Sequence, residues 1–329
     1  MHRQGKKELV FDKPGRGRVY DSLLETIGNT PMVRINALAQ DAGCLADVLV
    51  KLEFFNPVAS VKDRIAVAMI EAMEAEGIVR PDSVIVEPTA GNTGIGLAFV
   101  CAAKGLRCIL TMPDGFSIER RKLMEFFGAE LVLTPAKDGI RGTIEKANEI
   151  VALTDNAVMP WQYGNPANPE VHRRTTAEEI WNDTGGTVDA VVLGVGTGGT
   201  LTGVGEVLKQ RKPDVRIVAV EPENSPVLSG GVPFPHGIQG IGTGFVPDAL
   251  NVDIIDEVML ASETEAIQTA RKLAVLEGVP AGISSGAALA CALRYAARAG
   301  MHSKTVVTVL PSFAERYLST ALFKGPDEH

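Results

Sequence analysis

Short apolar runs alternate with amphipathic stretches along most of the chain, beginning near residue 48. Runs of this length, rich in β-branched residues, are typical of strands buried on both faces of a sheet. The predicted strands are residues 48–52, 84–86, 108–111, 131–133, 191–193, 217–220 and 306–310. Because the stretches between them have helical periodicity, we expect mostly parallel, twisted sheets covered by helices on both faces, an α/β fold.

The stretches between the strands show helical spacing and helix-start residues. Ile65, Met69 and Met73 recur every four residues and share one predicted helical face. Asn168 is expected to cap a helix that continues through Pro169 and Glu170. Other predicted helices are residues 92–104, 144–150 and 285–299, one that buries Leu123, Phe126 and Phe127, and one that starts at a Ser262–Glu265 capping box and buries Ala266, Ala270 and Leu273.

The chain has 329 residues, which exceeds what one hydrophobic core usually holds and therefore predicts two domains. The boundary is expected near residues 162–166, where Gly164 and Pro166 interrupt the alternation. A formal net charge of −8 argues against nucleic acid or an anionic membrane as the main partner. The four cysteines show no CxxC spacing, which argues against a zinc site and favours a reducing compartment, the cytoplasm.

Residues 1–18 differ in composition from the rest of the chain. They carry six Lys or Arg residues against two acidic ones and include Pro14, Gly15 and Gly17. We expect a flexible basic tail. An organelle transit peptide is the weaker alternative, since the segment has no serine and contains Glu8 and Asp12.

A glycine-rich loop, residues 194–200 (GVGTGGT), lies between a predicted strand and a predicted helix. Glycines let the backbone approach an anion, and a helix start offers free N–H groups. Gly194, Gly196 and Gly199 also satisfy G-x-G-x-x-G, and Glu221 follows about twenty residues later, as in dinucleotide sites. Taken alone, the loop predicts a phosphate site and leaves a nicotinamide, a flavin or another phosphorylated cofactor open.

Three further segments offer chemistry beside predicted helix starts. Lys62 follows a loop, and a lysine at the mouth of such a sheet can form a Schiff base with a carbonyl cofactor, although lysines at helix starts are usually only solvated. Residues 87–94 (EPTAGNTG) form a second anion cradle, suited to a carboxylate. Residues 282–286 (GISSG) offer Ser284 or Ser285 as a cap or a site residue. Two cradles favour an amino-acid substrate beside a phosphorylated cofactor.

Together these segments resemble the cysteine synthases (O-acetylserine sulfhydrylases) of the tryptophan-synthase-β-like pyridoxal-phosphate (PLP) enzymes. The resemblance runs from residue 22 to residue 320. Its landmarks are residues 56–64 (NPVASVKDR), 91–96 (GNTGIG), 165–169 (NPANP), 196–200 (GTGGT), 239–242 (QGIG) and 315–320 (ERYLST). The resemblance implies that the glycine loop holds PLP rather than a dinucleotide, in a cleft between two domains.

The resemblance also implies individual roles. Lys62 matches the lysine that holds PLP and then removes the substrate α-proton. Asn92 matches the residue at the ring hydroxyl, and Ser284 matches the hydroxyl at the pyridine nitrogen. The phosphate loop corresponds to Gly196, Thr197, Gly198, Gly199 and Thr200, and the substrate site to Thr89, Gly91, Thr93, Gln162 and the entrance residue Gly240.

The implied reaction is the β-replacement that forms L-cysteine from O-acetyl-L-serine and sulfide through an α-aminoacrylate intermediate. A neutral Ser284 hydroxyl at the ring nitrogen makes the cofactor a mild electron sink, which suits ejection of a β-leaving group. One position departs from the family pattern, because Ala90 stands where a serine is usual. The lost hydroxyl removes a hydrogen bond worth about 1 kcal/mol, so we expect weaker carboxylate binding.

Several alternatives stay open. Cystathionine formation from homocysteine, or the use of O-phosphoserine, would share the first half of the reaction, and O-phosphoserine would call for an additional cation in the pocket. Ala90 also raises the alternative of a weakly catalytic protein that binds the C-terminal tail of serine acetyltransferase. A nicotinamide dehydrogenase is the third alternative, and it leaves Lys62 unexplained.

The resemblance further implies a homodimer and a division of the chain into four parts. Residues 1–18 form the tail, and residues 19–49 pack on the C-terminal domain. Residues 50–163 form a smaller N-terminal domain with Lys62 and the substrate loop. Residues 164–323 form the C-terminal domain with the phosphate loop.

Overall fold

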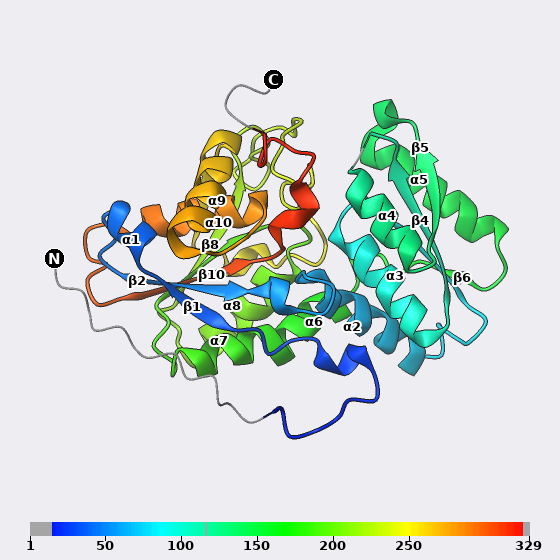
Figure 1. Cartoon of the computed structure of the whole chain (residues 1–329), viewed down its shortest axis with the longest axis horizontal. Coiled ribbons are helices and arrows are strands. Elements are labelled where there is room, and N and C mark those ends of the chain that lie inside the picture. The colour runs from blue at the N-terminus through cyan, green and yellow to red at the C-terminus, as the bar shows by residue number, and fades with distance from the viewer. Residues whose placement is uncertain (1–14, 116, 325–329) are drawn as a thin grey trace.

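The computed structural model describes residues 15–115 and 117–324. Of the predicted basic tail, residues 1–14 therefore lie outside the described residues. The chain forms two units, each a twisted sheet with helices on both faces (Figure 1). The predicted α/β architecture with mostly parallel sheets is confirmed.

The larger unit is built on a six-stranded sheet in the order β1-β2-β10-β7-β8-β9. Only β1 runs antiparallel to its neighbour, a strand that the sequence pattern did not predict. The other pairs are parallel, as expected for strands joined through helices. The strands are β1 (Met32–Ile35), β2 (Asp47–Leu52), β7 (Ala190–Gly194), β8 (Arg216–Pro222), β9 (Glu257–Ala261) and β10 (Thr305–Leu310).

The smaller unit is built on a four-stranded parallel sheet in the order β5-β4-β3-β6. Its strands are β3 (Val84–Pro88), β4 (Arg107–Pro113), β5 (Glu130–Thr134) and β6 (Ala157–Val158). Successive β3 residues enter different cores: Val84 and Val86 pack with Ala147 of a covering helix, whereas Ile85 faces the other helices. This alternation follows from the two-residue period of a strand.

Helices cover both faces of each sheet (Figure 1). One core of the larger unit joins its sheet to α9 and α10, and a second joins the opposite face to α7 and α8. The helices are α1 (Ala37–Asp41), α2 (Lys62–Ala75), α3 (Asn92–Lys104), α4 (Ile118–Phe126), α5 (Gly139–Leu153), α6 (Ala167–Val171), α7 (Ala177–Asp183), α8 (Gly199–Arg211), α9 (Glu263–Glu277) and α10 (Ile283–Ala296). The shorter turns are η1 (Leu23–Thr26), η2 (Glu53–Phe55), η3 (Ala136–Asp138), the π-helical η4 (His172–Thr176), η5 (Val252–Ile254) and η6 (Ala314–Tyr317).

Two local predictions are wrong. Phe126 was predicted to be buried but is 83% exposed. The inward face of α4 instead carries the fully buried Met124 and the partly buried Leu123 and Phe127. Asn168 does not cap α6, which starts one residue earlier. Its buried side chain instead donates hydrogen bonds across the site described below.

The predicted start of the smaller domain at residue 50 also has to move. Residues 47–52 form β2 and pair along their whole length with β10 in the six-stranded sheet. We propose that the smaller domain begins after Leu52 and ends near residue 163. Within the described ranges, no helix is both long enough and apolar enough to cross a membrane.

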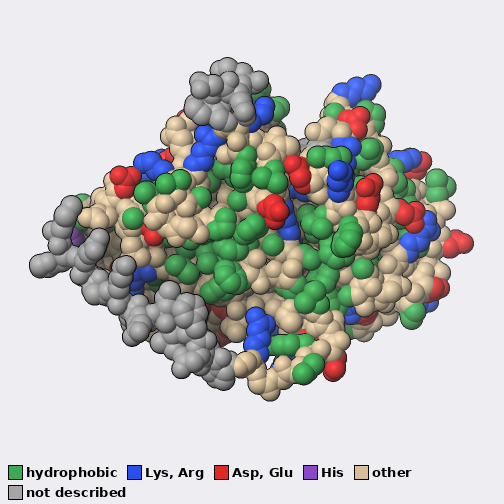
Figure 2. Space-filling model, in the orientation of Figure 1, with side chains coloured by type: hydrophobic (Ala, Val, Ile, Leu, Met, Phe, Trp, Pro, Cys, Tyr) green, Lys and Arg blue, Asp and Glu red, His purple; other side chains and the backbone are tan. Residues whose placement is uncertain are grey.

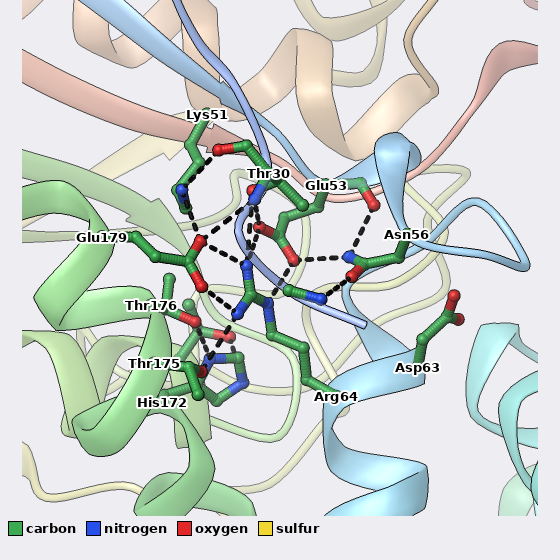
Figure 3. A network of polar contacts seen from close by, with 12 residues as sticks. Thr30, Lys51, Glu53, Asn56, Asp63, Arg64, His172, Thr175, Thr176 and Glu179 are labelled. Atoms are coloured by element: carbon green, nitrogen blue, oxygen red, sulfur yellow. Dashed lines mark hydrogen bonds and ion pairs between the residues drawn. The ribbon is translucent and has the colours of Figure 1, made fainter. Parts of the chain in front are cut away.

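A buried ion network joins α2 to the larger unit (Figure 3). Arg64, in the first turn of α2 and 1% exposed, donates from Nε and Nη2 to the two carboxylate oxygens of Glu53, each at 2.8 Å. Its Nη1 and Nη2 also donate to Glu179 of α7, at 2.7 and 2.8 Å. Lys51 of β2 lies 2.7 Å from the same Glu179, so two cations face two carboxylates.

The charges of this network stabilise one another. Burial alone would raise the pKa of Glu53, but the Arg64 guanidinium lowers it below its ordinary value. Burial alone would also raise the pKa of Glu179, but Arg64 and Lys51 overcome that effect and lower it to about 2. Both acids are therefore carboxylates at neutral pH, and removing one charge would leave an unpaired ion in a buried place.

We expect Glu53→Gln to lower the free energy of unfolding by about 3–5 kcal/mol, because it breaks a buried bidentate pair with Arg64. Urea denaturation measures this change. Glu130→Gln is the matched control, since it breaks the Arg107–Glu130 pair, whose side chains are 54% and 53% exposed. That control should cost less than about 1 kcal/mol. Equal losses in the two variants would contradict the importance of the buried network.

Candidate active site

Lys62 is the first residue of α2 and is held at its start by backbone contacts. Val61 N donates to the carbonyl oxygen of Pro311, directly after β10, at 2.8 Å. On the other side α3 passes so close that a Cβ at Gly96 would lie 3.1 Å from the Lys62 carbonyl oxygen. The lysine backbone is therefore fixed between the end of β10 and α3.

The glycine loop lies between β7 and α8, as predicted. A Cβ at Gly196 would lie 2.4 Å from the Gly240 carbonyl oxygen, and one at Gly199 would lie 1.9 Å from Asn168 Oδ1. Gly198 has φ +82°, a left-handed conformation that favours glycine. The loop therefore packs tightly from behind, and the first N–H groups of α8 have no acceptor within their helix. Such a helix N-terminus binds anions.

Two threonines of this loop are anchored by side chains from α6 and η4. Thr197 Oγ1 accepts a hydrogen bond from Asn168 Nδ2 at 2.9 Å. Thr200 Oγ1 lies 3.1 Å from His172 Nε2, and His172 Nδ1 lies 2.8 Å from Thr176 Oγ1. Burial lowers the pKa of His172 to about 3, so this imidazole is neutral and orients hydroxyls without adding charge.

The second cradle lies between β3 and α3. Thr93 Oγ1 donates to Gln162 Oε1 at 2.6 Å, which brings the two predicted substrate residues together. The backbone N–H groups of Trp161 and Gln162 donate to the two carboxylate oxygens of Glu87, at 2.8 and 3.0 Å. These contacts hold the 161–162 segment against the end of β3 and so fix Gln162 opposite Thr93.

Two adjoining cavities bring the predicted residues together. Predicted residues lining the inner cavity are Lys62, Asn92, Gly196, Thr197, Gly198, Thr200, Gly240 and Ser284. Those lining the outer cavity are Lys62, Thr89, Gly91, Asn92, Thr93, Gln162, Gly196, Thr197 and Gly240. Gly199 lines neither, because it packs against Asn168 behind the loop. Lys62 lines both and thus lies where the two cavities meet.

The sequence pattern did not predict that three further residues, Arg120, Arg316 and Tyr317, lie at or beside the two cavities. Arg120 and Tyr317 line the outer and inner cavities, respectively. Arg316 donates from Nη1 to Asn92 Oδ1 at 2.7 Å. Arg120 belongs to the charged run ERRK, which reads as a solvated helix face, and no local pattern marks Arg316 as buried.

The chain matches the family described as pyridoxal-phosphate dependent enzyme over residues 23–312. It is 53% identical over 308 residues to a cysteine synthase of Staphylococcus aureus, which covers 93% of this chain and 98% of that protein. The chain belongs to the cysteine synthase family of PLP-dependent enzymes.

Solved structures of similar proteins support the same family assignment. A cysteine synthase of Entamoeba histolytica superposes with a TM-score of 0.93 and 43% identity, covering 98% of this chain and 96% of that chain. An O-ureido-L-serine synthase superposes with a TM-score of 0.90 and 45% identity, covering 95% of this chain and 98% of that chain. The family therefore includes members whose names refer to different products.

The inner cavity fits PLP by the chemistry of its donors. The glycine loop and the α8 N-terminus suit a phosphate, and Lys62 offers an amine for an aldehyde. Ser284, in the first turn of α10 and 3% exposed, places a neutral hydroxyl in the same cavity. Burial lowers the pKa of Lys62 to about 8, so a substantial share of this amine is neutral near that pH.

We expect the rate at which the cofactor-free enzyme takes up PLP to rise with pH, with a midpoint near pH 8. The physical reason is that only the neutral amine attacks an aldehyde, and burial lowers the pKa of Lys62 from 10.5 to about 8. Stopped-flow absorbance of the visible PLP band measures the rate. Lys62→Ala should show only the absorbance of free PLP, without the shifted band of the enzyme-bound cofactor, and a midpoint near 10.5 in the unaltered enzyme would contradict the prediction.

Proposed function

We propose that this enzyme forms L-cysteine from O-acetyl-L-serine and sulfide, with PLP held in the inner cavity. The observation that carries the proposal is the position of Lys62, which lines both the cavity of the glycine loop and the cavity of the Thr89–Thr93 segment. The 53% identity to a cysteine synthase supports the same reaction. PLP, when bound, supplies the electron sink for elimination of acetate from the β-carbon.

The cofactor would be held by groups from both units. In this proposal Lys62 Nζ binds the aldehyde carbon, and the loop Gly196–Thr200 binds the phosphate through the α8 N-terminus. Asn92 Nδ2 donates to the ring hydroxyl oxygen. Ser284 Oγ would face the pyridine nitrogen, where a neutral hydroxyl would leave that nitrogen largely unprotonated.

The outer cavity would hold the substrate carboxylate. The first N–H groups of α3 have no acceptor within the helix, and the Thr93–Gln162 pair lies beside them. Tyr163 and Phe245 line the same cavity with ring centroids 5.2 Å apart. As a neutral amine, Lys62 Nζ would accept the α-proton of the bound amino acid.

Arg120 favours a second candidate with a phosphorylated leaving group. Its side chain is 4% exposed and lines the outer cavity, and its Nη1 lies 3.4 Å from the Ala90 carbonyl oxygen. Its Nε has no hydrogen-bond partner among the described residues. A buried cation beside the substrate loop suits O-phosphoserine, which was expected to need one.

Steady-state kinetics with paired substrates test the proposal. We expect a higher kcat/KM for O-acetylserine than for O-phosphoserine, and for sulfide than for homocysteine. Lys62→Ala should lose at least about a hundredfold in kcat, because it removes the general base. A clear preference for O-phosphoserine would support the second candidate instead, and a preference for homocysteine would make cystathionine the product.

The Ala90→Ser variant tests the departure in the substrate loop. We expect its KM for O-acetylserine to fall about fivefold, since a restored hydroxyl adds a hydrogen bond worth about 1 kcal/mol to the carboxylate. The KM for sulfide is the internal control and should not change. An unchanged or higher KM for O-acetylserine would show that the backbone N–H groups alone determine carboxylate binding.

The assembly and location of the enzyme are part of the proposal. A homodimer is consistent with the hydrophobic side chains that gather on the middle of the face in Figure 2, and with Phe55, Ile118 and Leu318, each at least half exposed. Light scattering of the native enzyme tests the dimer.

The outer cavity is the proposed place for the C-terminal tail of serine acetyltransferase, which a tail peptide competing with O-acetylserine would reveal. Four free cysteines fit a reducing compartment, and we propose the cytoplasm.

A further inference from the structure

Arg316 is a buried cation that the proposed reaction does not use. It lies in η6, is 8% exposed, and donates from Nη1 to Asn92 Oδ1 at 2.7 Å. Among the described residues its guanidinium forms no salt bridge within 4.0 Å. Burial lowers the pKa of Arg316, and the nearby buried Asp63 opposes that effect without direct contact. Burying a guanidinium without a direct ion pair costs free energy of folding. Such a residue is therefore a candidate for a functional role.

The contact with Arg316 fixes the orientation of the Asn92 amide. A guanidinium has only donors, so the amide atom that faces it has to be the oxygen. The amide nitrogen, which is the donor end, therefore points elsewhere. Asn92 lines the inner cavity together with Lys62 and Ser284, and its Nδ2 has no protein acceptor among the described residues.

The position of Arg316 is itself firmly fixed. Its neighbour Tyr317 is 1% exposed, and the Tyr317 hydroxyl lies 2.9 Å from Ser312 Oγ. A Cβ at Gly282 would lie 2.3 Å from the Tyr317 ring, so α10 begins in direct contact with η6. Arg316 thus reaches from the larger unit to the N-terminus of α3 in the smaller unit, across 224 residues of sequence.

We propose that Arg316 is a positioning residue that holds the Asn92 amide with its N–H donors toward the ring oxygen of the cofactor. This inference rests on the proposed cofactor site. Without Arg316 the amide can rotate and present its oxygen to that acceptor, which replaces a hydrogen bond with a repulsive contact. The fixed donor also stabilises the deprotonated ring oxygen, so its loss raises the pH at which the visible band of the bound cofactor changes.

A double-mutant cycle on PLP affinity tests this proposal. The full chain, stripped of cofactor, is titrated with PLP by absorbance, without substrate. We expect Arg316→Gln to weaken PLP binding about tenfold and to raise the pH midpoint of the visible band. In the Asn92→Ala background, Arg316→Gln should have no further effect on affinity, because Arg316 acts through Asn92. Effects that multiply in the double variant would overturn the proposal.

Ser319→Ala is the matched control, since Ser319 Oγ, three residues from Arg316, donates to Glu119 Oε2 at 3.1 Å and also bridges the two units. It should leave PLP affinity unchanged, and a loss equal to that of Arg316→Gln would show that general docking of the segment is responsible. Asn92→Asp is the second variant if Arg316→Gln does not fold. It keeps an acceptor for Arg316 but has no N–H donor, so it should weaken PLP binding at least about tenfold. Wild-type affinity in Asn92→Asp would overturn the proposal.

These readouts are independent of the reaction. If the unaltered enzyme binds PLP but forms no cysteine from O-acetylserine and sulfide, the proposed reaction fails while the titrations still decide the role of Arg316. If the cycle is additive while cysteine forms, only the role of Arg316 fails.

Discussion

The position of Lys62 relative to the glycine loop depends on the buried network around Arg64. Helix α2 buries its apolar side, with Ile65, Met69 and Met73, in the core of the smaller unit. The glycine loop belongs to the larger unit. Apolar packing is not directional, whereas the bidentate contacts of Arg64 with Glu53 and Glu179 restrict both distance and orientation. Together with the Val61–Pro311 hydrogen bond, the network sets where the first turn of α2, and hence the amine, meets the loop.

Burial also lowers the pKa values of two basic side chains beside the glycine loop. It favours the neutral amine of Lys62 and keeps His172 neutral behind the glycine loop. In the proposed site, the N–H groups of α3 and α8 hold the anions. Among the described residues, the guanidinium groups of Arg120 and Arg316 are also buried beside it. Arg120 lines the outer cavity, and Arg316 donates to Asn92 Oδ1.

Much of the fold followed from local patterns, whereas the roles of the site residues followed from the family resemblance. Residues 92–104 were predicted as a helix and form α3 with those bounds, because a long apolar run between two strand patterns has few alternatives. Lys62, Asn92 and Ser284 lie in the first turns of α2, α3 and α10, and these helix starts come from two different sheets and meet only in the folded chain.

The rest depends on contacts between distant residues. Strand β1 shows no strong alternation and exists because it pairs with β2. Asn168 has the sequence context of a cap, but its amide meets Thr197 only in the folded chain. Arg316 and Arg120 carry charges that predict exposure, and only tertiary packing buries them. The alanine at position 90 was visible in the sequence, whereas the cation beside it was not.

The central claim is that Lys62 holds PLP at the junction of the two cavities. Borohydride reduction of the PLP-loaded enzyme fixes the cofactor to the lysine that carries it, and peptide mass spectrometry then locates the label. The account predicts a single labelled tryptic peptide, residues 52–64 (LEFFNPVASVKDR), uncut at Lys62 because the side chain is blocked. A label on another lysine, or a yellow enzyme without any fixed label, would contradict the account.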